Sequence, residues 1–89
     1  MGTDRRDIKL NVAVARELKS IRIKKNLRME DVAKENDLSC ETLRRYEKDA
    51  ANIPIKTLEK LLEYYKMPPA IFFENVCVYN HDFQDAESF

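Results

Sequence analysis

Residues 27–54, LRMEDVAKENDLSCETLRRYEKDAANIP, constrain the fold more than any other stretch of the chain. Their apolar residues recur as they would on two short helices that share one buried face and are joined by a tight turn. The residues of that face are Leu27, Val32, Ala33, Leu38, Leu43 and Tyr46. Asn36 and Asp37 interrupt the first helical pattern, and both residue types accept the turn or left-handed conformations that a sharp corner requires. Ser39 suits the N-cap of the second helix, which we expect to run from about Cys40 to Lys48.

The second predicted helix has a polar, doubly basic outer face. At helical spacing Leu43 and Tyr46 point inward. The outward positions are Cys40, Glu41, Arg44, Arg45 and Lys48. A basic, exposed helix directly after a turn is what a reader of the DNA major groove requires, so the pattern indicates a helix-turn-helix.

Through these residues the chain resembles the lambda-repressor/Cro-like helix-turn-helix proteins, also called the xenobiotic-response-element type, over about residues 10–73. The match consists of Leu27, Glu30 to Ala33, Leu38, Ser39, Thr42, Leu43, Arg45 to Glu47, Asn52 and Pro54. The resemblance implies that the first helix of the motif contacts the DNA backbone near its N-terminus. It also implies that the second helix lies in the major groove with its early residues on base edges.

Carried over by position, the resemblance assigns two groups of residues to DNA. The residues expected near backbone phosphates are Arg28, Met29, Ser39 and Lys48. The residues expected to face bases are Cys40, Glu41, Arg44 and Arg45. Arginine to guanine is the commonest specific contact in the major groove, which gives the two arginines the leading role.

Four positions depart from the pattern of the family. Met29 stands where a hydrogen-bonding Gln is common, and Asn36 stands where an apolar core residue is usual. Asp37 and Asp49 stand where Gly is usual. We expect both Asp residues to be tolerated, because Asp visits the left-handed region more readily than most residues. Loss of a hydrogen-bonding side chain at Met29 bears more on function than on folding.

The remaining sequence predicts three further helices and therefore an all-α fold. Asn11 is the expected N-cap of a helix to about Lys25, Pro54 begins a helix that ends before Pro68, and Pro69 opens a short one. Their inward residues are expected to be Val14, Leu18 and Ile21, then Leu58, Leu61, Leu62 and Tyr65, then Ile71 and Phe72. The resulting architecture is a compact five-helix, lambda-repressor-like domain.

The expected organisation has one domain flanked by two short segments. Residues 1–9 form an N-terminal arm, residues 10–74 the helix-turn-helix domain and residues 75–89 a C-terminal extension. Val76 and Val78 favour a β-strand in that extension, which leaves open a dimerisation strand or a mobile tail.

Charge is distributed unevenly in a chain whose formal net charge is zero. Residues 1–48 carry thirteen Lys or Arg against nine Asp or Glu, whereas residues 49–89 carry three against seven. The motif lies in the basic half, and salt screens the acidic half from a bound DNA backbone at a Debye length of ~8 Å. We therefore expect DNA binding with little non-specific affinity.

Several function classes lack their sequence signatures. The chain has no Gly-rich phosphate loop, nucleophile elbow or His-carboxylate arrangement, so we expect no enzymatic activity. One His and two Cys provide no zinc spacing, and we expect no metal and no cofactor. The sequence has neither a membrane-length apolar run nor a signal peptide, which predicts a cytoplasmic protein with reduced thiols.

The sequence thus predicts a sequence-specific regulator of transcription that binds double-stranded DNA. The expected form is a repressor that occupies a palindromic operator as a homodimer. The alternative is a protein-interaction module, such as an antirepressor, adaptor or antitoxin, that retains the fold and binds a protein partner. Neutral net charge, Met29 and the aromatic residues near the C-terminus favour that alternative.

Overall fold

The computed structural model describes residues 8–79, which form five helices and no strand. In chain order the helices are α1 (Leu10–Lys24), α2 (Met29–Glu35), α3 (Cys40–Tyr46), α4 (Ile55–Tyr65) and α5 (Pro69–Tyr79). The all-α, five-helix architecture expected from the sequence is confirmed.

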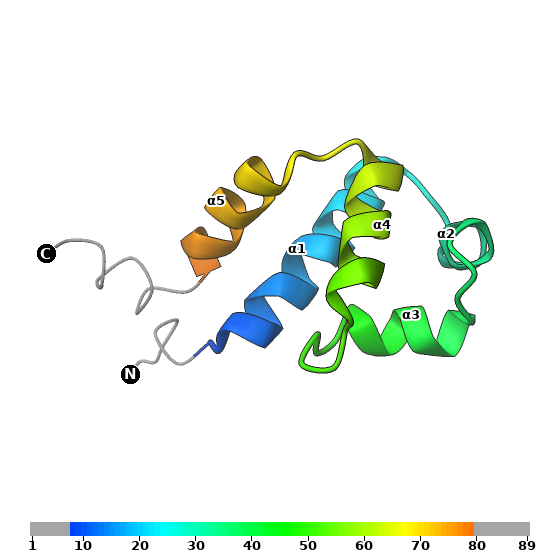
Figure 1. Ribbon diagram of the computed structural model, residues 1–89, viewed down its shortest axis with the longest axis horizontal. Helices are drawn as coiled ribbons and strands as arrows, with labels where there is room; N and C mark the ends of the chain where they lie inside the picture. The colour runs from blue at the N-terminus through cyan, green and yellow to red at the C-terminus, as the bar shows by residue number, and fades with distance from the viewer. Residues whose placement is uncertain (1–7, 80–89) are drawn as a thin grey trace, which may run out of the picture.

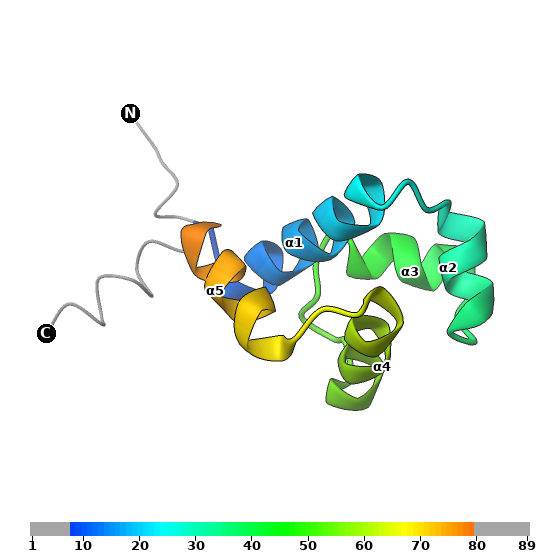
Figure 2. The ribbon, with the colours of Figure 1, turned by 90° about the horizontal axis from the view of Figure 1, so that it is seen from above.

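The helices are arranged around α1. α5 lies beside α1 (Figure 1), and these two helices form the most extensive helix pair of the fold. α2 and α3 pack against each other at the opposite end of the molecule (Figure 2). Asn75 of α5 donates a hydrogen bond from Nδ2 to Oε2 of the buried Glu17 on α1, at 3.1 Å. This arrangement leaves the outer face of α3 free of other helices.

The apolar core confirms the stripes expected on the first four helices. Its buried side chains include Val14, Leu18, Ile21, Val32, Ala33, Leu43, Leu58, Leu61, Leu62 and Tyr65. Full burial of a large apolar side chain stabilises the fold by roughly 1.5–3 kcal/mol. The core therefore fixes α3 through a single buried residue, Leu43, while the rest of that helix remains available for contacts outside the domain.

The last helix contributes different core residues from those expected. Phe72 is fully buried, as predicted, but Ile71 is 47 % exposed. Its expected place is taken by Val76, which is fully buried one helical turn after Phe72. The prediction for Ile71 is wrong because α5 is apolar on nearly all sides, so its sequence alone does not mark the face that packs on α1.

The C-terminal extension begins as a helix. Residues 75–79 form the last part of α5, so a strand at Val76 and Val78 is wrong. Five residues of strand would lack a sheet to join, whereas continuing α5 keeps their backbone groups hydrogen-bonded. Residues 80–89, and residues 1–7 of the expected N-terminal arm, lie outside the described residues.

Two expected helix ends differ from the observed ones. α1 begins at Leu10 with Lys9 in the N-cap position and no side-chain cap, so Asn11 is not the cap. α3 ends at Tyr46 rather than near Lys48, and Tyr46 is half-buried rather than fully packed into the core. The Asn11 side chain has a more distant partner, described below.

The turn between α2 and α3 follows the sequence prediction. Asp37 adopts a left-handed conformation with φ 58°. Asn36, just before it, is buried, and its amide Nδ2 donates to the carbonyl oxygen of Val32 at 2.8 Å. The side chain therefore satisfies itself within α2, which explains how a polar residue occupies a core position. Asp49 does not adopt the left-handed conformation that its position suggested.

Candidate nucleic-acid interface

α3 begins with a complete side-chain cap. Ser39 has extended backbone geometry, and its Oγ accepts the backbone N–H of Thr42 at 3.0 Å. The Ser39 hydroxyl also pairs with Oγ1 of Thr42, at 2.8 Å. A Ser N-cap stabilises a helix by about 1 kcal/mol, which matters for a helix of seven residues. The N-cap prediction is confirmed.

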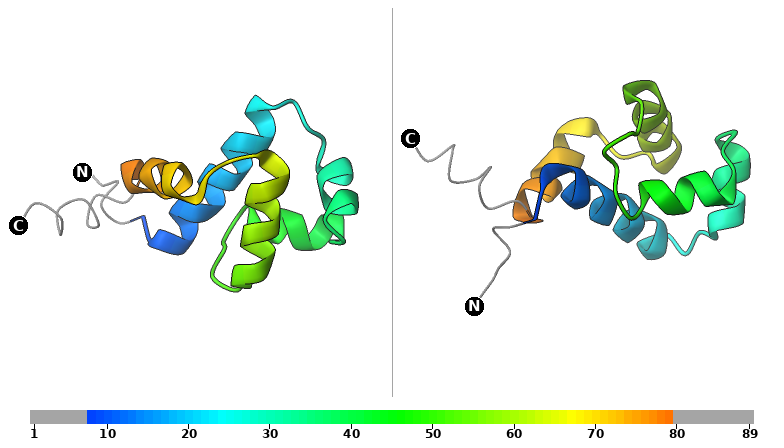
Figure 3. Two further views of the ribbon diagram at one scale, coloured as in Figure 1. Left: turned by 45° about the horizontal axis from the view of Figure 1, so that its top comes forward. Right: turned by 90° about the horizontal axis from the view of Figure 1, so that it is seen from below.

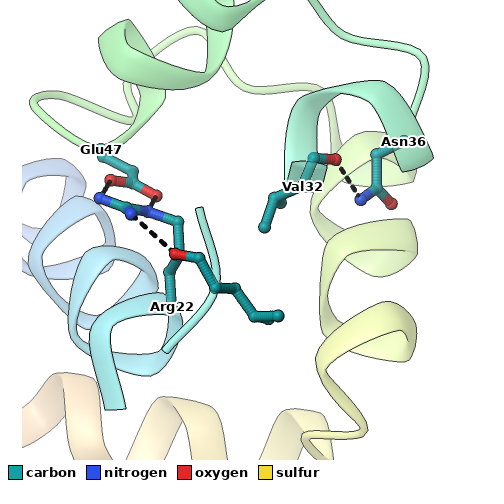
Figure 4. Close-up of polar contacts among 5 residues, drawn as sticks. Arg22, Val32, Asn36 and Glu47 are labelled. Atoms are coloured by element: carbon teal, nitrogen blue, oxygen red, sulfur yellow. Dashed lines mark hydrogen bonds and ion pairs between the residues drawn. The ribbon is translucent and has the colours of Figure 1, made fainter. Parts of the chain in front are cut away.

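The end of α3 is tied to α1 by a buried ion pair (Figure 4). Arg22 donates from Nε and Nη2 to the two carboxylate oxygens of Glu47, at 2.8 and 3.0 Å. Its Nη1 donates to the carbonyl oxygen of Leu27 at 3.1 Å. The hydrogen bond to Glu47 raises the pKa of Arg22. Of the partners considered for Glu47, Arg22 and Lys25, the structure selects Arg22.

The loop after α3 is tied to the start of α1. Asn11 donates from Nδ2 to Oδ1 of Asp49 at 2.6 Å, and its carbonyl oxygen accepts the N–H of Ala50 at 3.1 Å. Asp49 also accepts the backbone N–H of Ala51 at 2.9 Å. The hydrogen bond from Asn11 lowers the pKa of Asp49, and the backbone bond acts in the same direction. Both ends of α3 are thus held by specific polar contacts.

The residues expected to face bases lie together on α3. Glu41, Arg44 and Arg45 are exposed, whereas Cys40 is half-buried and packs against the core. Neither Arg44 nor Arg45 forms an ion pair with another described residue. Two unpaired guanidinium groups on an exposed helix face are able to donate bidentate hydrogen bonds to guanine or phosphate.

The residues expected near the DNA backbone are more dispersed. Ser39 and Lys48 are exposed at the two ends of α3. Arg28, before α2, is exposed and lies 3.9 Å from Glu30 and 3.6 Å from Asp31, so two carboxylates share its charge. Met29 is half-buried and packs against the core.

The fold also brings together residues that the sequence left unassigned. A hollow of about 310 Å³ lies between α1, the start of α2 and α3. Its lining residues are Lys19, Arg22, Met29, Arg44, Glu47 and Lys48. Lys19 had no individual role in the sequence analysis, although its place one turn before Arg22 puts both on the same side of α1.

Other kinds of site are not seen in the described residues. Within residues 8–79, no group of three His, Cys, Asp or Glu side chains is placed to hold a metal ion. None of the described helices is both long enough and apolar enough to cross a membrane.

Comparison with known proteins agrees with this geometry. The helix-turn-helix family profile matches residues 18–72, which is more than half of the chain. No curated protein matches significantly.

Among solved structures, the chain is similar to the restriction-modification controller protein C.Esp1396I. A point mutant of that protein in a trigonal crystal form has a TM-score of 0.74 and 28 % identity, covering 79 % of this chain and 93 % of the controller chain. The wild-type controller protein has a TM-score of 0.71 and 26 % identity, covering 82 % and 94 % of the two chains. The chain therefore belongs to the lambda-repressor-like helix-turn-helix family of DNA-binding transcription regulators.

Proposed function

We propose that the protein is a transcriptional repressor that binds a palindromic operator as a homodimer, with α3 in the major groove. The observation that carries the proposal is the outer face of α3, where Arg44 and Arg45 are exposed and unpaired among the described residues. Bound across a promoter, such a domain would exclude polymerase by occupancy. The similarity to a restriction-modification controller protein supports a regulatory role.

The proposed base contacts are made by Cys40, Glu41, Arg44 and Arg45. Each arginine can bind guanine O6 and N7 with two hydrogen bonds, worth roughly 1–3 kcal/mol of discrimination. Glu41 can accept a hydrogen bond from cytosine N4. Cys40 is small enough to let the backbone of α3 approach the bases.

The proposed backbone contacts are made by Ser39, Lys48, Arg28 and Met29. Lys48 supplies an unshared charge, and the Ser39 hydroxyl supplies a short-range hydrogen bond. Arg28 must loosen two exposed ion pairs, which contribute little in water. Met29 has no donor for phosphate, so its contribution is limited to packing.

The proposed dimer contact is the outer side of α5. Ile71, Phe73 and Val78 are 47 %, 40 % and 61 % exposed, although α5 also buries Phe72 and Val76 against α1. A helix that is apolar on all sides is normally buried on all sides. A second copy of the chain would cover this face and place two α3 helices at half-sites about 34 Å apart.

Fluorescence anisotropy tests the DNA-binding part of the proposal. The wild-type protein should bind the duplex upstream of its own gene more tightly than a scrambled duplex. Arg44→Ala or Arg45→Ala should weaken operator binding about 5- to 100-fold while the melting temperature is kept. Lys34→Ala, which removes an exposed cation from the last turn of α2, is the matched control and should bind as wild type does. Unchanged affinity in both arginine variants would refute the assignment.

Sedimentation velocity tests the dimer. The wild-type chain should sediment as a dimer, and Phe73→Glu should sediment as a folded monomer with weaker operator binding. A wild-type monomer that binds neither duplex would instead favour the protein-interaction module, with α5 as the surface for a different partner.

A further inference from the structure

We propose that the hollow between α1 and α3 is a binding site for one backbone phosphate of DNA, with Lys19 as its main contact. The inference rests on the proposed function and extends the DNA-binding surface to α1, outside the helix-turn-helix itself. Figure 3 shows α1 and α3 running side by side, with α2 at one end of the pair. Residues from all three helices line the hollow, including Lys19 of α1 and Arg44 of α3.

The charges of the hollow do not cancel. Arg22 and Glu47 neutralise each other in the bidentate ion pair, so they contribute no net charge. Lys19 and Arg44 are exposed, as is Lys48, and none of these three forms an ion pair with another described residue. Three cations around one hollow repel one another, and a phosphate oxyanion between them would relieve that repulsion.

The position of the hollow matches the path of a bound DNA backbone. Arg44 belongs both to the hollow and to the exposed face of α3 that we assign to the major groove. Lys48 follows it by four residues, one helical turn beyond. A duplex whose bases meet α3 therefore has its flanking phosphates close to the mouth of the hollow, where the Lys19 ammonium is available.

The chemistry of the wall explains why α1 is needed. Met29, at the start of α2, lines the hollow with a thioether that cannot donate a hydrogen bond. Arg22 already uses three of its N–H donors on Glu47 and on the carbonyl of Leu27. Lys19 is left as a flexible ammonium with three free donors, so it supplies what α2 does not.

The test is a salt series of anisotropy titrations with Lys19→Gln. Loss of one phosphate contact should weaken binding to operator and scrambled duplexes by the same factor, about 3- to 10-fold at moderate salt. It should also reduce the slope of log affinity against log salt by about 0.9. Lys19→Arg keeps the charge and should retain most of the affinity. Lys66→Gln removes an exposed cation from the end of α4 that lies away from α3 (Figure 1) and should change neither quantity.

The outcomes separate this inference from the proposed function. Specific operator binding by the wild type, with Lys19→Gln matching Lys66→Gln in affinity and slope, would overturn the phosphate site and leave the function intact. Equal wild-type binding to both duplexes, still weakened by Lys19→Gln, would refute the specific function and support the site. A folded wild-type protein that binds no duplex would overturn both.

A free anion is distinguished by competition. Inorganic phosphate, exchanged for sulfate at constant ionic strength, should displace DNA no better than sulfate does. Displacement by phosphate alone, abolished in Lys19→Gln, would show that the hollow holds free phosphate and would overturn its assignment to DNA.

Discussion

Replacing Glu47 by alanine tests the role of the buried ion pair that joins α3 to α1. The side chain of Glu47 is 3 % exposed and that of Arg22 is 14 % exposed, so both charges are largely removed from water. Glu47→Ala deletes two hydrogen bonds between charged groups and leaves the Arg22 guanidinium with only the carbonyl of Leu27. Removing one partner of a buried ion pair costs about 3–5 kcal/mol.

The residual exposure of Arg22 places the expected loss near the lower end of that range, at about 3 kcal/mol. For a domain of this size, each kcal/mol lowers the melting temperature by about 4–8 °C. The expected fall is therefore on the order of 12–24 °C. Glu47→Gln retains one acceptor for Arg22 without the charge, so its loss should be about half as large.

Urea denaturation followed by far-UV circular dichroism measures these free energies. Glu59→Ala removes an exposed carboxylate from α4 and should change the free energy of unfolding by less than about 0.5 kcal/mol. The double variant Arg22→Met with Glu47→Leu replaces the pair by apolar side chains and should be more stable than either single variant. A loss below about 1 kcal/mol for Glu47→Ala, or losses that simply add in the double variant, would refute the reasoning.

Three further changes probe the segments that hold α3. Asp37→Gly removes the strain of a left-handed Asp and should raise the free energy of unfolding by about 0.5 kcal/mol in the same urea assay, because the exposed contact it loses to Lys60 is weak. Ser39→Ala should lower that free energy by about 1 kcal/mol through loss of the N-cap, and an unchanged midpoint would show that the cap contributes nothing. The lowered pKa of Asp49 predicts a stabilising contribution that is present above its ordinary pKa of about 3.9 and is lost as pH falls through the lowered pKa. Melting curves across acidic pH should therefore show a smaller decline for Asp49→Ala than for the wild type.

The parts of the fold that sequence predicted correctly depend on local physical chemistry. The stripe of Val14, Leu18 and Ile21 is a helical period, and burial of that face follows directly from it. The left-handed Asp37 and the Ser39 cap depend only on neighbouring residues. These features needed no knowledge of how the helices pack.

The parts that sequence did not predict depend on residues far apart in the chain. Asn11 has the chemistry of an N-cap, but it binds Asp49, 38 residues later, because folding brings the α3–α4 loop to the start of α1. On α5, Ile71, Phe72 and Val76 are all apolar, and only packing against α1 selects the latter two for the core. Contacts of this kind leave no periodic signal in a single sequence.

Neutral net charge is compatible with the proposed DNA binding because charge acts locally in salt. The shortest dimension of the molecule is 24 Å, about three Debye lengths at physiological ionic strength. A phosphate at α3 therefore responds to Arg44, Lys48 and Lys19 much more than to acidic groups on the far side. The same neutrality keeps general attraction to DNA low, so that most of the affinity must come from groups aimed at the duplex. For such a protein, a single misplaced cation should alter binding more than it would in a strongly basic one, which makes the charge-removal variants sensitive tests of the interface.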